Sequence, residues 1–313
     1  MKTVRQQRQF TVGTRRALAG MALALLAQVA APGAARAQYA FTTLDMPGAV
    51  ATYADGNSST RIVGEFDDAD GVTHGFVRTA GGVFKQYDVP GSEGWTSING
   101  INASGERSGI YGTADGRFHG FFWSHGQVTT LDPPDTDFSV AAFLNGKGQV
   151  VGFARKGTEP RHGFVWHDGV FTTIDAPDAG PRGTRPSGIN DRGQIVGAYY
   201  DTKDGGHLRG FLLDKGRYTP IDVPGTEDGF TYAQGINNGG LIVGYYAKND
   251  EDLDHGFVLS KDGYTTVDVP GAFWTDIYSV NANGDIVGAY EDESGVHGFR
   301  GTPAGRLEPD PVE

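Results

Sequence analysis

Hydrophobic and polar residues along this chain follow one short pattern that recurs six times. Each copy holds four extended segments rich in β-branched and aromatic residues, separated by Gly, Asn, Asp or Pro. The copy that begins at residue 188, GINDRGQIVGAYYDTKDGGHLRGF, is typical. Beyond the N-terminal region no segment keeps a 3.6-residue period, and the 49 glycines disfavour helices. The pattern therefore predicts short strands.

The copies are spaced by roughly 45 residues, a period that is typical of propellers and solenoids. The Asn of the GIN segment marks the register at Asn57, Asn102, Asn145, Asn190, Asn237 and Asn281. Four strands in each of six copies predict an all-β fold, a six-bladed β-propeller with four strands per blade. Turns such as NDRGQ and NANGD, with Asn first and Gly fourth, suit the connections between strands.

The two ends of the repeat region are incomplete in complementary ways. It starts with a fourth-strand sequence, FTTLD at 41–45, and ends just after a third-strand sequence, HGFR at 297–300. We therefore expect the N-terminal strand to pair with the C-terminal blade and to close the ring. The predicted organisation is a signal peptide at 1–37, the propeller at 38–301 and a C-terminal tail at 302–313.

The N-terminal segment has a basic start, an apolar stretch from Ala17 to about Ala31 and an A-x-A end at Ala35 and Ala37. These are the features of a secretory signal peptide, and the stretch is short for a membrane span. Thr14-Arg15-Arg16 partly matches a twin-arginine signal, so the general and twin-arginine export routes both stay open. A periplasmic or extracellular location follows.

Charge and cysteine content narrow the possible functions. Residues 1–37 hold six basic residues and no acidic residue, so their removal takes the formal net charge from −12 to −18. A chain this acidic repels nucleic-acid phosphates and anionic membrane surfaces. There is no cysteine, so disulfides, a cysteine nucleophile and thiolate metal sites are excluded. We expect a soluble monomer with a core of its own.

The segment GIN..G.IVG, followed by a His-small-Phe strand, resembles the extracellular HAF repeat family, which is named for a His-Ala-Phe triplet. Here the triplet reads His-Gly-Phe, with Arg209 in place of one histidine. The histidines are His74, His119, His162, His255 and His297. The resemblance covers residues 39–301. It implies an exported bacterial β-propeller and no single activity.

Recurring polar residues are interpreted as structural. A catalytic site needs one copy of a residue, whereas a blade needs one copy each. We expect the histidine to hydrogen-bond a neighbouring loop while the Phe two residues later, on the same strand face, packs between blades. The recurring Asn and Asp are expected to set turns.

Residues that differ between the copies are the better candidates for function, because propellers carry their sites on the loops of one face. The loops between a fourth strand and the next first strand combine aromatic and acidic residues. Such a combination suits sugar rings or cationic ligands, although the aromatics can equally pack the loops onto the blades. The predicted ligand-binding residues are Trp95, Phe138, Phe230, Trp274, Asp137, Glu227 and Asp276.

Two further loop features have competing readings. Arg182, Arg185 and Arg209 make the fourth copy basic, which suits the carboxylate or sulfate of a polyanion but also simple solubility. The alternating acids of DEDLD at 250–254 resemble calcium ligands without the full EF-hand pattern, so we expect an exposed acidic turn. No metal site and no cofactor are expected.

Function is predicted to be binding rather than catalysis. The chain has no G-x-S-x-G, no H-E-x-x-H and no phosphate-binding loop, and its catalytic residues, if any, are unknown. We expect an exported module that binds a glycan or a protein through the loop face. The alternatives are a propeller enzyme acting on polysaccharide or lactone-like substrates, with Asp137, Glu227 or Asp276 as acid or base, and a scaffold without a small ligand.

Overall fold

The computed structural model describes residues 39–202 and 206–304. The predicted signal peptide and most of the predicted C-terminal tail lie outside these residues. The described residues form an all-β fold of 24 strands, as the sequence predicts. In this part of the chain no helix is long and apolar enough to cross a membrane.

Strand pairing groups the 24 strands into six four-stranded antiparallel units. The first two are β2 (Ala51–Asn57), β3 (Arg61–Asp67), β4 (Thr73–Thr79) and β5 (Phe84–Tyr87), then β6 (Thr96–Ile101), β7 (Arg107–Gly112), β8 (Phe118–Ser124) and β9 (Gln127–Thr130). The third and fourth are β10 (Phe138–Leu144), β11 (Val150–Arg155), β12 (His162–His167) and β13 (Val170–Thr173), then β14 (Ala179–Ile189), β15 (Ile195–Asp201), β16 (Leu208–Asp214) and β17 (Arg217–Ile221). The fifth and sixth are β18 (Phe230–Ile236), β19 (Ile242–Ala247), β20 (His255–Ser260) and β21 (Gly263–Thr266), then β22 (Trp274–Val280), β23 (Ile286–Asp292), β24 (Gly295–Pro303) and β1 (Tyr39–Leu44).

The sixth unit is completed by the N-terminal strand. β1 pairs antiparallel with β24, from Tyr39 opposite Pro303 to Leu44 opposite Gly298. This is the pairing that the sequence predicts for the N-terminal strand. β24 continues to Pro303, so its last residues fall within what the sequence assigns to the tail.

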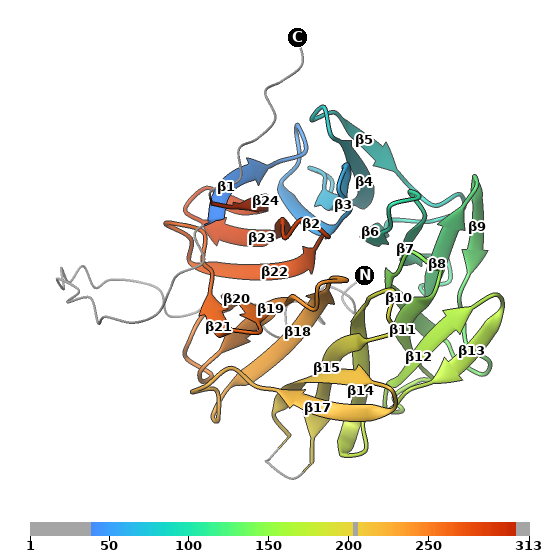
Figure 1. Cartoon of the computed structure of the whole chain (residues 1–313). Coiled ribbons are helices and arrows are strands. Elements are labelled where there is room, and N and C mark those ends of the chain that lie inside the picture. The colour runs from blue at the N-terminus through green and yellow to red at the C-terminus, as the bar shows by residue number, and fades with distance from the viewer. Residues whose placement is uncertain (1–38, 203–205, 305–313) are drawn as a thin grey trace. The chain divides into compact units, whose positions relative to one another are not determined.

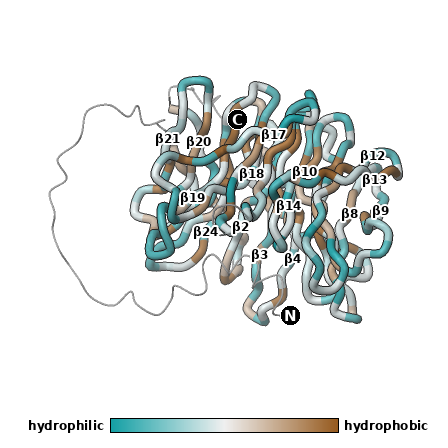
Figure 2. The backbone as a smooth tube through the Cα atoms, turned by 90° about the horizontal axis from the view of Figure 1, so that it is seen from below, coloured by the Kyte–Doolittle hydropathy of each residue, from teal (hydrophilic) through white to brown (hydrophobic). Residues whose placement is uncertain are grey.

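The first strands of neighbouring units lie against one another, and β2, β6, β10 and β22 are seen around the middle of the arrangement in Figure 1. Each of these six strands contacts the first strands of both neighbouring units, and β2 contacts β22 as well as β6. Each first strand begins after a variable loop and ends at the turn that starts with the recurring Asn. The two ends of these strands therefore present two different sets of loops. Hydrophilic residues concentrate in the loops and hydrophobic residues in the strands (Figure 2).

The glycine of IVG and the phenylalanine of HGF form one packing motif. In each unit they are cross-strand partners, as in Gly244 opposite Phe257 and Gly64 opposite Phe76. A Cβ at Gly244 would collide with the carbonyl oxygen of Tyr232 and lie 2.9 Å from the Phe257 ring. Glycine is therefore required here by the close approach of the ring and the first strand. The six phenylalanines are almost fully buried: Phe76, Phe121, Phe164, Phe211, Phe257 and Phe299.

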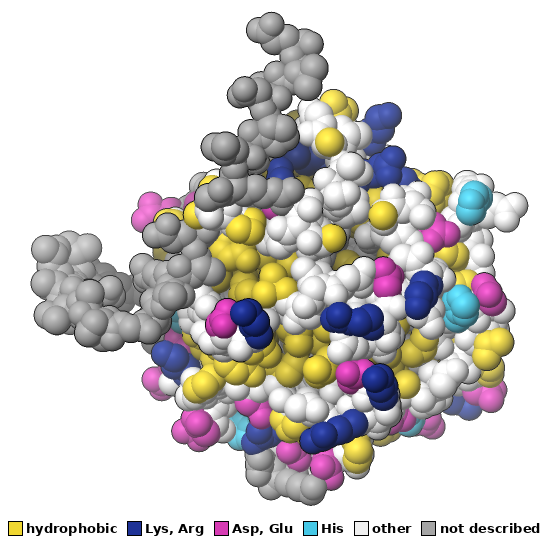
Figure 3. Space-filling model, in the orientation of Figure 1, with side chains coloured by type: hydrophobic (Ala, Val, Ile, Leu, Met, Phe, Trp, Pro, Cys, Tyr) yellow, Lys and Arg dark blue, Asp and Glu magenta, His cyan; other side chains and the backbone are white. Residues whose placement is uncertain are grey.

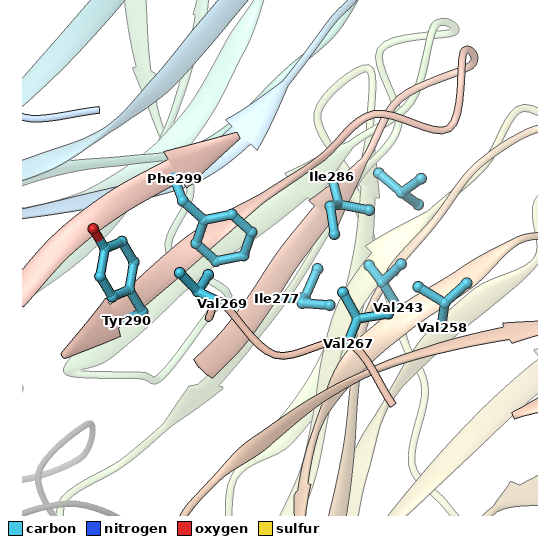
Figure 4. Packing of buried hydrophobic residues seen from close by; sticks show 9 residues of the cluster. Val243, Val258, Val267, Val269, Ile277, Ile286, Tyr290 and Phe299 are labelled. Carbon is cyan, nitrogen blue, oxygen red and sulfur yellow. The ribbon is translucent and has the colours of Figure 1, made fainter. Parts of the chain in front are cut away.

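The hydrophobic core is divided into clusters that lie between neighbouring units. One cluster joins Val243, Val258 and Val267 of the fifth unit to Ile277 and Ile286 of the sixth (Figure 4). Each side chain of this kind stabilises the fold by about 1.5 to 3 kcal/mol when it is fully buried. Because the clusters span the boundaries between units, no unit has a complete core of its own.

The recurring Asn links the units in addition to setting a turn. Its Oδ1 accepts hydrogen bonds from backbone amides two and four residues further on, as Asn190 does from Arg192 and Gln194. Its Nδ2 donates to a backbone carbonyl of the next unit, at distances of 2.9 to 3.2 Å. These links run Asn102 to Asn145, Asn145 to Asn190, Asn190 to Asn237, Asn237 to Asn281, and Asn281 to Ser58.

The first unit corrects the predicted register, because Ser58 rather than Asn57 occupies the Asn position. The turn there is one residue shorter: the Ser58 amide bonds to the carbonyl of Arg61, whereas the Asn102 amide bonds to the carbonyl four residues on. Asn57 lies one position earlier and donates from Nδ2 to the carbonyl of Asp285, at 2.9 Å. The shorter Ser58 side chain bonds within its own turn, to the Arg61 carbonyl at 3.5 Å, so in the described residues the Asn link from the first unit to the second is missing.

Candidate functional site: the variable-loop face

The recurring histidine pairs with the recurring aspartate of its own unit. Nδ1 of the histidine lies 2.7 to 3.0 Å from a carboxylate oxygen of the aspartate that follows the fourth strand. The pairs are His74–Asp88, His119–Asp132, His162–Asp175, His255–Asp268 and His297–Asp45. This repeated contact ties the third strand to the variable loop, which is the structural role that the sequence predicts.

In the fourth unit Arg209 takes the place of the histidine. Its Nη1 donates to Asp222 at 2.7 Å, and its Nε lies 3.3 Å from Asp201. Two carboxylates thus offset this guanidinium charge. The predicted basic region of the fourth unit therefore depends on its other arginines, because Arg209 serves the same structural contact as the histidines.

The four predicted aromatic residues lie at equivalent places, where the variable loops enter the first strands. Phe138, Phe230 and Trp274 begin β10, β18 and β22, and Trp95 directly precedes β6. Phe138 and Trp274 are each only 7% exposed, and the Trp274 indole donates to Glu291 at 2.7 Å. Trp95 and Phe230 are partly exposed. Burial makes Phe138 and Trp274 packing residues first, and leaves Trp95 and Phe230 with accessible ring surface.

Trp95 has one further feature. Its indole Nε1 is buried, and no group in the described part of the chain accepts a hydrogen bond from it. A buried donor without an acceptor costs about 1 to 3 kcal/mol. The Trp95 indole N–H is thus a hydrogen-bond donor that the described part of the chain leaves unused.

The three predicted acids have separate surroundings. Asp137 is exposed, and both of its carboxylate oxygens accept the Gly157 amide at 2.9 Å, which shapes the loop. Asp276 is buried and accepts a hydrogen bond from the Tyr278 hydroxyl at 3.2 Å. Glu227 lines a cavity of about 240 Å³ between β16 and the loop before β18, together with the ion-paired Arg209. The structure gives each carboxylate its own role and does not show them as one acid–base pair.

An arc of rings runs around the centre, which sequence analysis missed. On its first half, Trp95 lies 6.2 Å from Phe118, Phe118 lies 6.3 Å from Phe138, and Phe138 lies 6.2 Å from Phe153, as ring-centroid distances. The Arg185 guanidinium then lies 5.2 Å from the Phe153 ring. We call this set, with its continuation, the aromatic arc.

The second half of the aromatic arc continues from Arg185. Its guanidinium lies 5.5 Å from the Tyr232 ring, Tyr232 lies 5.6 Å from Tyr245, and Tyr245 lies 6.3 Å from Tyr278. Burial, and then the charge of Asp276, raise the pKa of the Tyr245 phenol well above its usual value. The phenol therefore stays protonated at physiological pH. Rings with hydroxyl and guanidinium groups between them suit a ligand that is both apolar and polar.

Sequence analysis missed Phe118, Phe153 and Tyr245 because they lie in second and third strands, whose recurring residues were interpreted as structural. One signal was present: the residue after the IVG glycine varies between copies, and this position holds both Phe153 and Tyr245. Hydrophobic side chains also gather around the middle of the molecular face shown in Figure 3, with basic and acidic side chains among them.

The acidic turn near residue 250 is held by its own hydrogen bonds. The Asp252 carboxylate accepts the Lys248 amide at 3.0 Å and lies 3.6 Å from His255. Within residues 39–202 and 206–304 no group of three or more His, Asp or Glu side chains is arranged to hold a metal ion.

Comparisons with known proteins identify the fold. A variant of the Aleuria aurantia lectin in complex with α-methyl-L-fucoside has 13% sequence identity and a TM-score of 0.51, covering 85% of this chain and all of the lectin. The lectin AofleA from Arthrobotrys oligospora has 12% identity and a TM-score of 0.53, covering 87% of this chain and 88% of its own. The β-propeller domain of a protease from Pyrococcus furiosus has 8% identity and a TM-score of 0.51, covering 83% and 97%.

These likenesses show that the chain has a β-propeller fold, as the sequence predicts. At such low identity they show the fold alone. No protein-family model matches the sequence, and no curated protein matches it.

Proposed function

We propose that this protein is an exported, carbohydrate-binding β-propeller of six blades. Each four-stranded unit is one blade, and β1 closes the ring by pairing with β24. Ligand binds at the variable-loop face, in the periplasm or outside the cell. The HAF repeat resemblance and the signal-peptide features of residues 1–37 support export.

The aromatic arc is the observation that supports this proposal most strongly. Trp95, Phe118 and Phe230 present partly exposed rings at the ends of the first and third strands, where the variable loops meet. Flat rings suit the C–H faces of sugars, and the Trp95 indole and the Arg185 guanidinium supply hydrogen-bond donors. A site of this composition binds its ligand without chemistry.

Two of the structural neighbours are lectins, and one of them holds a fucoside. This supports carbohydrate as the ligand class at the level of fold only. The site differs from chain to chain at such low identity. The sugar that this protein binds is therefore a matter for experiment rather than analogy.

The enzyme alternative has weaker support. Acid–base catalysis on a glycosidic bond needs two carboxyl groups about 5 to 9.5 Å apart across the bond. Asp137 supports a loop, Asp276 is buried beside Tyr278, and Glu227 lines a cavity beside Arg209. These separate roles favour binding.

A glycan array, followed by titration calorimetry on the glycans retained, tests the proposal. We expect Trp95→Ala to weaken binding at least tenfold, because it removes both a ring face and a donor, worth about 1.5 to 3 kcal/mol together. Phe84→Ala is the matched control. Phe84 is also a partly buried ring, but it lies in β5, the outer strand of the first unit, where it packs on Phe76. Retention of no glycan, or release of sugar products during incubation, contradicts the proposal.

A further inference from the structure

Three arginines gather on the aromatic arc between the third and fourth units. The Arg161 and Arg185 guanidinium groups lie over the same ring, Phe153, at 5.9 and 5.2 Å from its centroid. The Arg155 guanidinium lies 5.2 Å from the ring of Phe138, which neighbours Phe153. Arg155 and Arg161 flank the loop between β11 and β12 of the third unit, and Arg185 comes from β14 of the fourth, so the packing of two units brings the three together.

Among the described residues, none of the three has a counter-charge. In the described ranges, no carboxylate oxygen lies within 4.0 Å of Arg155, Arg161 or Arg185, and the Nε atom of each is buried without a hydrogen-bond partner. Arg209 and Arg300, by contrast, are each paired with a carboxylate. Arg78 and Arg107 also stack on rings with a buried, unpartnered Nε, but Arg155, Arg161 and Arg185 are three such arginines gathered on two neighbouring rings.

Burial and the neighbouring guanidinium charges both act on Arg161. Burial, and then repulsion from Arg185 and Arg155, lower its pKa to about 10. The guanidinium still carries its proton at neutral pH. Three positive charges thus remain close together in a partly buried place, where their repulsion is weakly screened by water.

Guanidinium groups bind carboxylates and sulfates through paired N–H donors, and such charge-assisted bonds are about twice as strong as neutral ones. The contacts of the cluster's own arginines are with uncharged groups: Tyr200 hydrogen-bonds Arg185, and the Arg182 carbonyl accepts from Arg161 Nη1 at 3.5 Å. The Tyr232 ring lies 5.5 Å from the Arg185 guanidinium, and its hydroxyl accepts from Ser187 at 3.1 Å. An anion entering this place therefore meets donors on several sides and no opposing carboxylate among the contacts of these arginines.

We propose that Arg155, Arg161 and Arg185 bind the anionic group, a carboxylate or a sulfate, of an acidic sugar. This inference rests on the proposed function, and it names the class of glycan. The acidic group sits at the arginine cluster, and the rest of the glycan extends over the variable-loop face. Arg155, Arg161 and Arg185 are specificity residues in this scheme, because a neutral sugar leaves them uncompensated.

Calorimetric titration of the purified protein with three probes tests the inference. The probes are an oligogalacturonate, a sulfated galactan oligosaccharide and the neutral galactan oligosaccharide. We expect one or both acidic probes to bind at least tenfold more tightly than the neutral one, and to weaken as salt rises. The acidic probe that binds identifies the anionic group as carboxylate or sulfate.

Variants locate the site. Arg161→Gln and Arg185→Gln should each weaken binding of the acidic probe by roughly ten- to a hundredfold, the value of a hydrogen bond to a charged group. Arg107→Gln is the matched control, because Arg107 also stacks on aromatic rings, Trp123 at 4.1 Å and Tyr87 at 5.4 Å, but stands outside the cluster. It should leave binding unchanged.

Thermal unfolding of the free variants separates binding from structural support. Removing one of three repelling charges should leave the unfolding midpoint unchanged or raise it, although binding is lost. A lower midpoint with unchanged affinity would show that the arginines only support the fold, and would overturn the inference.

The remaining outcomes distinguish the inference from the proposed function. Equal binding of acidic and neutral probes, unaffected by both arginine variants, overturns the inference and leaves the carbohydrate-binding function standing. Tight binding of an acidic probe that ignores Arg161→Gln and Arg185→Gln also overturns it. Binding of no probe, together with no retention on a glycan array, overturns both.

Discussion

The two ends of the six first strands differ in how their residues recur. At the Asn end, five units carry the same side chain, and each donates to a carbonyl of the next unit. At the variable-loop end, the first-strand position opposite the residue after the IVG glycine differs between every two neighbouring units. It holds Tyr53, Ser97, Val140, Arg185, Tyr232 and Asp276. One end of the strands repeats a bond that joins units, and the other end changes residue from unit to unit.

The difference separates residues that hold the units together from residues that are free to vary with a ligand. A hydrogen bond between units must be made at every boundary, so one residue type serves everywhere. A ligand has its own shape and charge, so the residues facing it need not match. Arg209 shows that even the His–Asp contact of the loop side accepts a replacement, provided the positive partner of Asp222 remains.

The largest expected effect comes from removing β1, because this strand runs along the whole of the sixth unit. Deleting residues 1–45 removes six paired residues opposite β24, the buried Leu44 and the Asp45 partner of His297. We expect the free energy of unfolding to fall by more than about 3 kcal/mol, in the range of the most disruptive changes. Urea unfolding against a chain starting at residue 38 measures this, and equal midpoints would contradict the closure of the ring by β1.

The next largest effect tests the Asn end alone. Asn190→Ala removes the bond to the Asn237 carbonyl at 3.1 Å and leaves the amides of Arg192 and Gln194 without their acceptor. We expect a loss of about 2 to 3 kcal/mol in the free energy of unfolding, because Asn190 is buried and the variant loses three partly buried hydrogen bonds at once. Ligand affinity should not change.

Asn249→Ala is the control for that variant. Asn249 also accepts hydrogen bonds from two amides of its own turn, those of Glu251 and Asp252, but it lies in an exposed loop. Its replacement should cost well under half as much. Equal losses in the two variants would show that the turn, rather than the link between units, gives the Asn its value.

The repeat itself could be predicted well from the sequence, because each strand copy is specified by the same local pattern. The burial of the HGF phenylalanine, exemplified by Phe257, follows from its recurrence in every copy. The pairing of β1 with β24 follows from the incomplete ends. The predicted register of the recurring Asn was wrong in the first unit. The turn there is one residue shorter, so Ser58 takes the position that the sequence Gly56-Asn57 suggested for Asn57.

The candidate site could be predicted only in part, because side-chain position depends on packing between units that no local pattern encodes. The loop residues Trp95 and Phe230 keep accessible rings, whereas Trp274 is buried and bonded to Glu291. Arg161 and Phe153 belong to segments that looked structural, and only the three-dimensional arrangement brings them to Arg185. Charge clusters formed across units are invisible in one copy of a repeat.

The smallest expected effect concerns pH and the His–Asp contact. The hydrogen bond to Asp268 raises the pKa of His255 above its usual value, against the opposing effect of burial, and Asp252 adds to the rise. A histidine with a raised pKa stabilises the folded state fully below its unfolded pKa of about 6.5, and this stability is lost as pH rises through the folded pKa. The unfolding midpoint of the native protein should therefore fall as pH rises above about 6.5.

Replacing His255 by Arg isolates this contribution. An arginine keeps its charge throughout this range, as Arg209 does in its pair with Asp222. Thermal unfolding of His255→Arg and of the native protein, from about pH 5.5 to pH 9, should give midpoints that diverge as pH rises, because only the native protein loses this charge. A constant difference across the range would show that the pair holds the loop through a neutral hydrogen bond, and that the histidine and arginine units are held by different interactions.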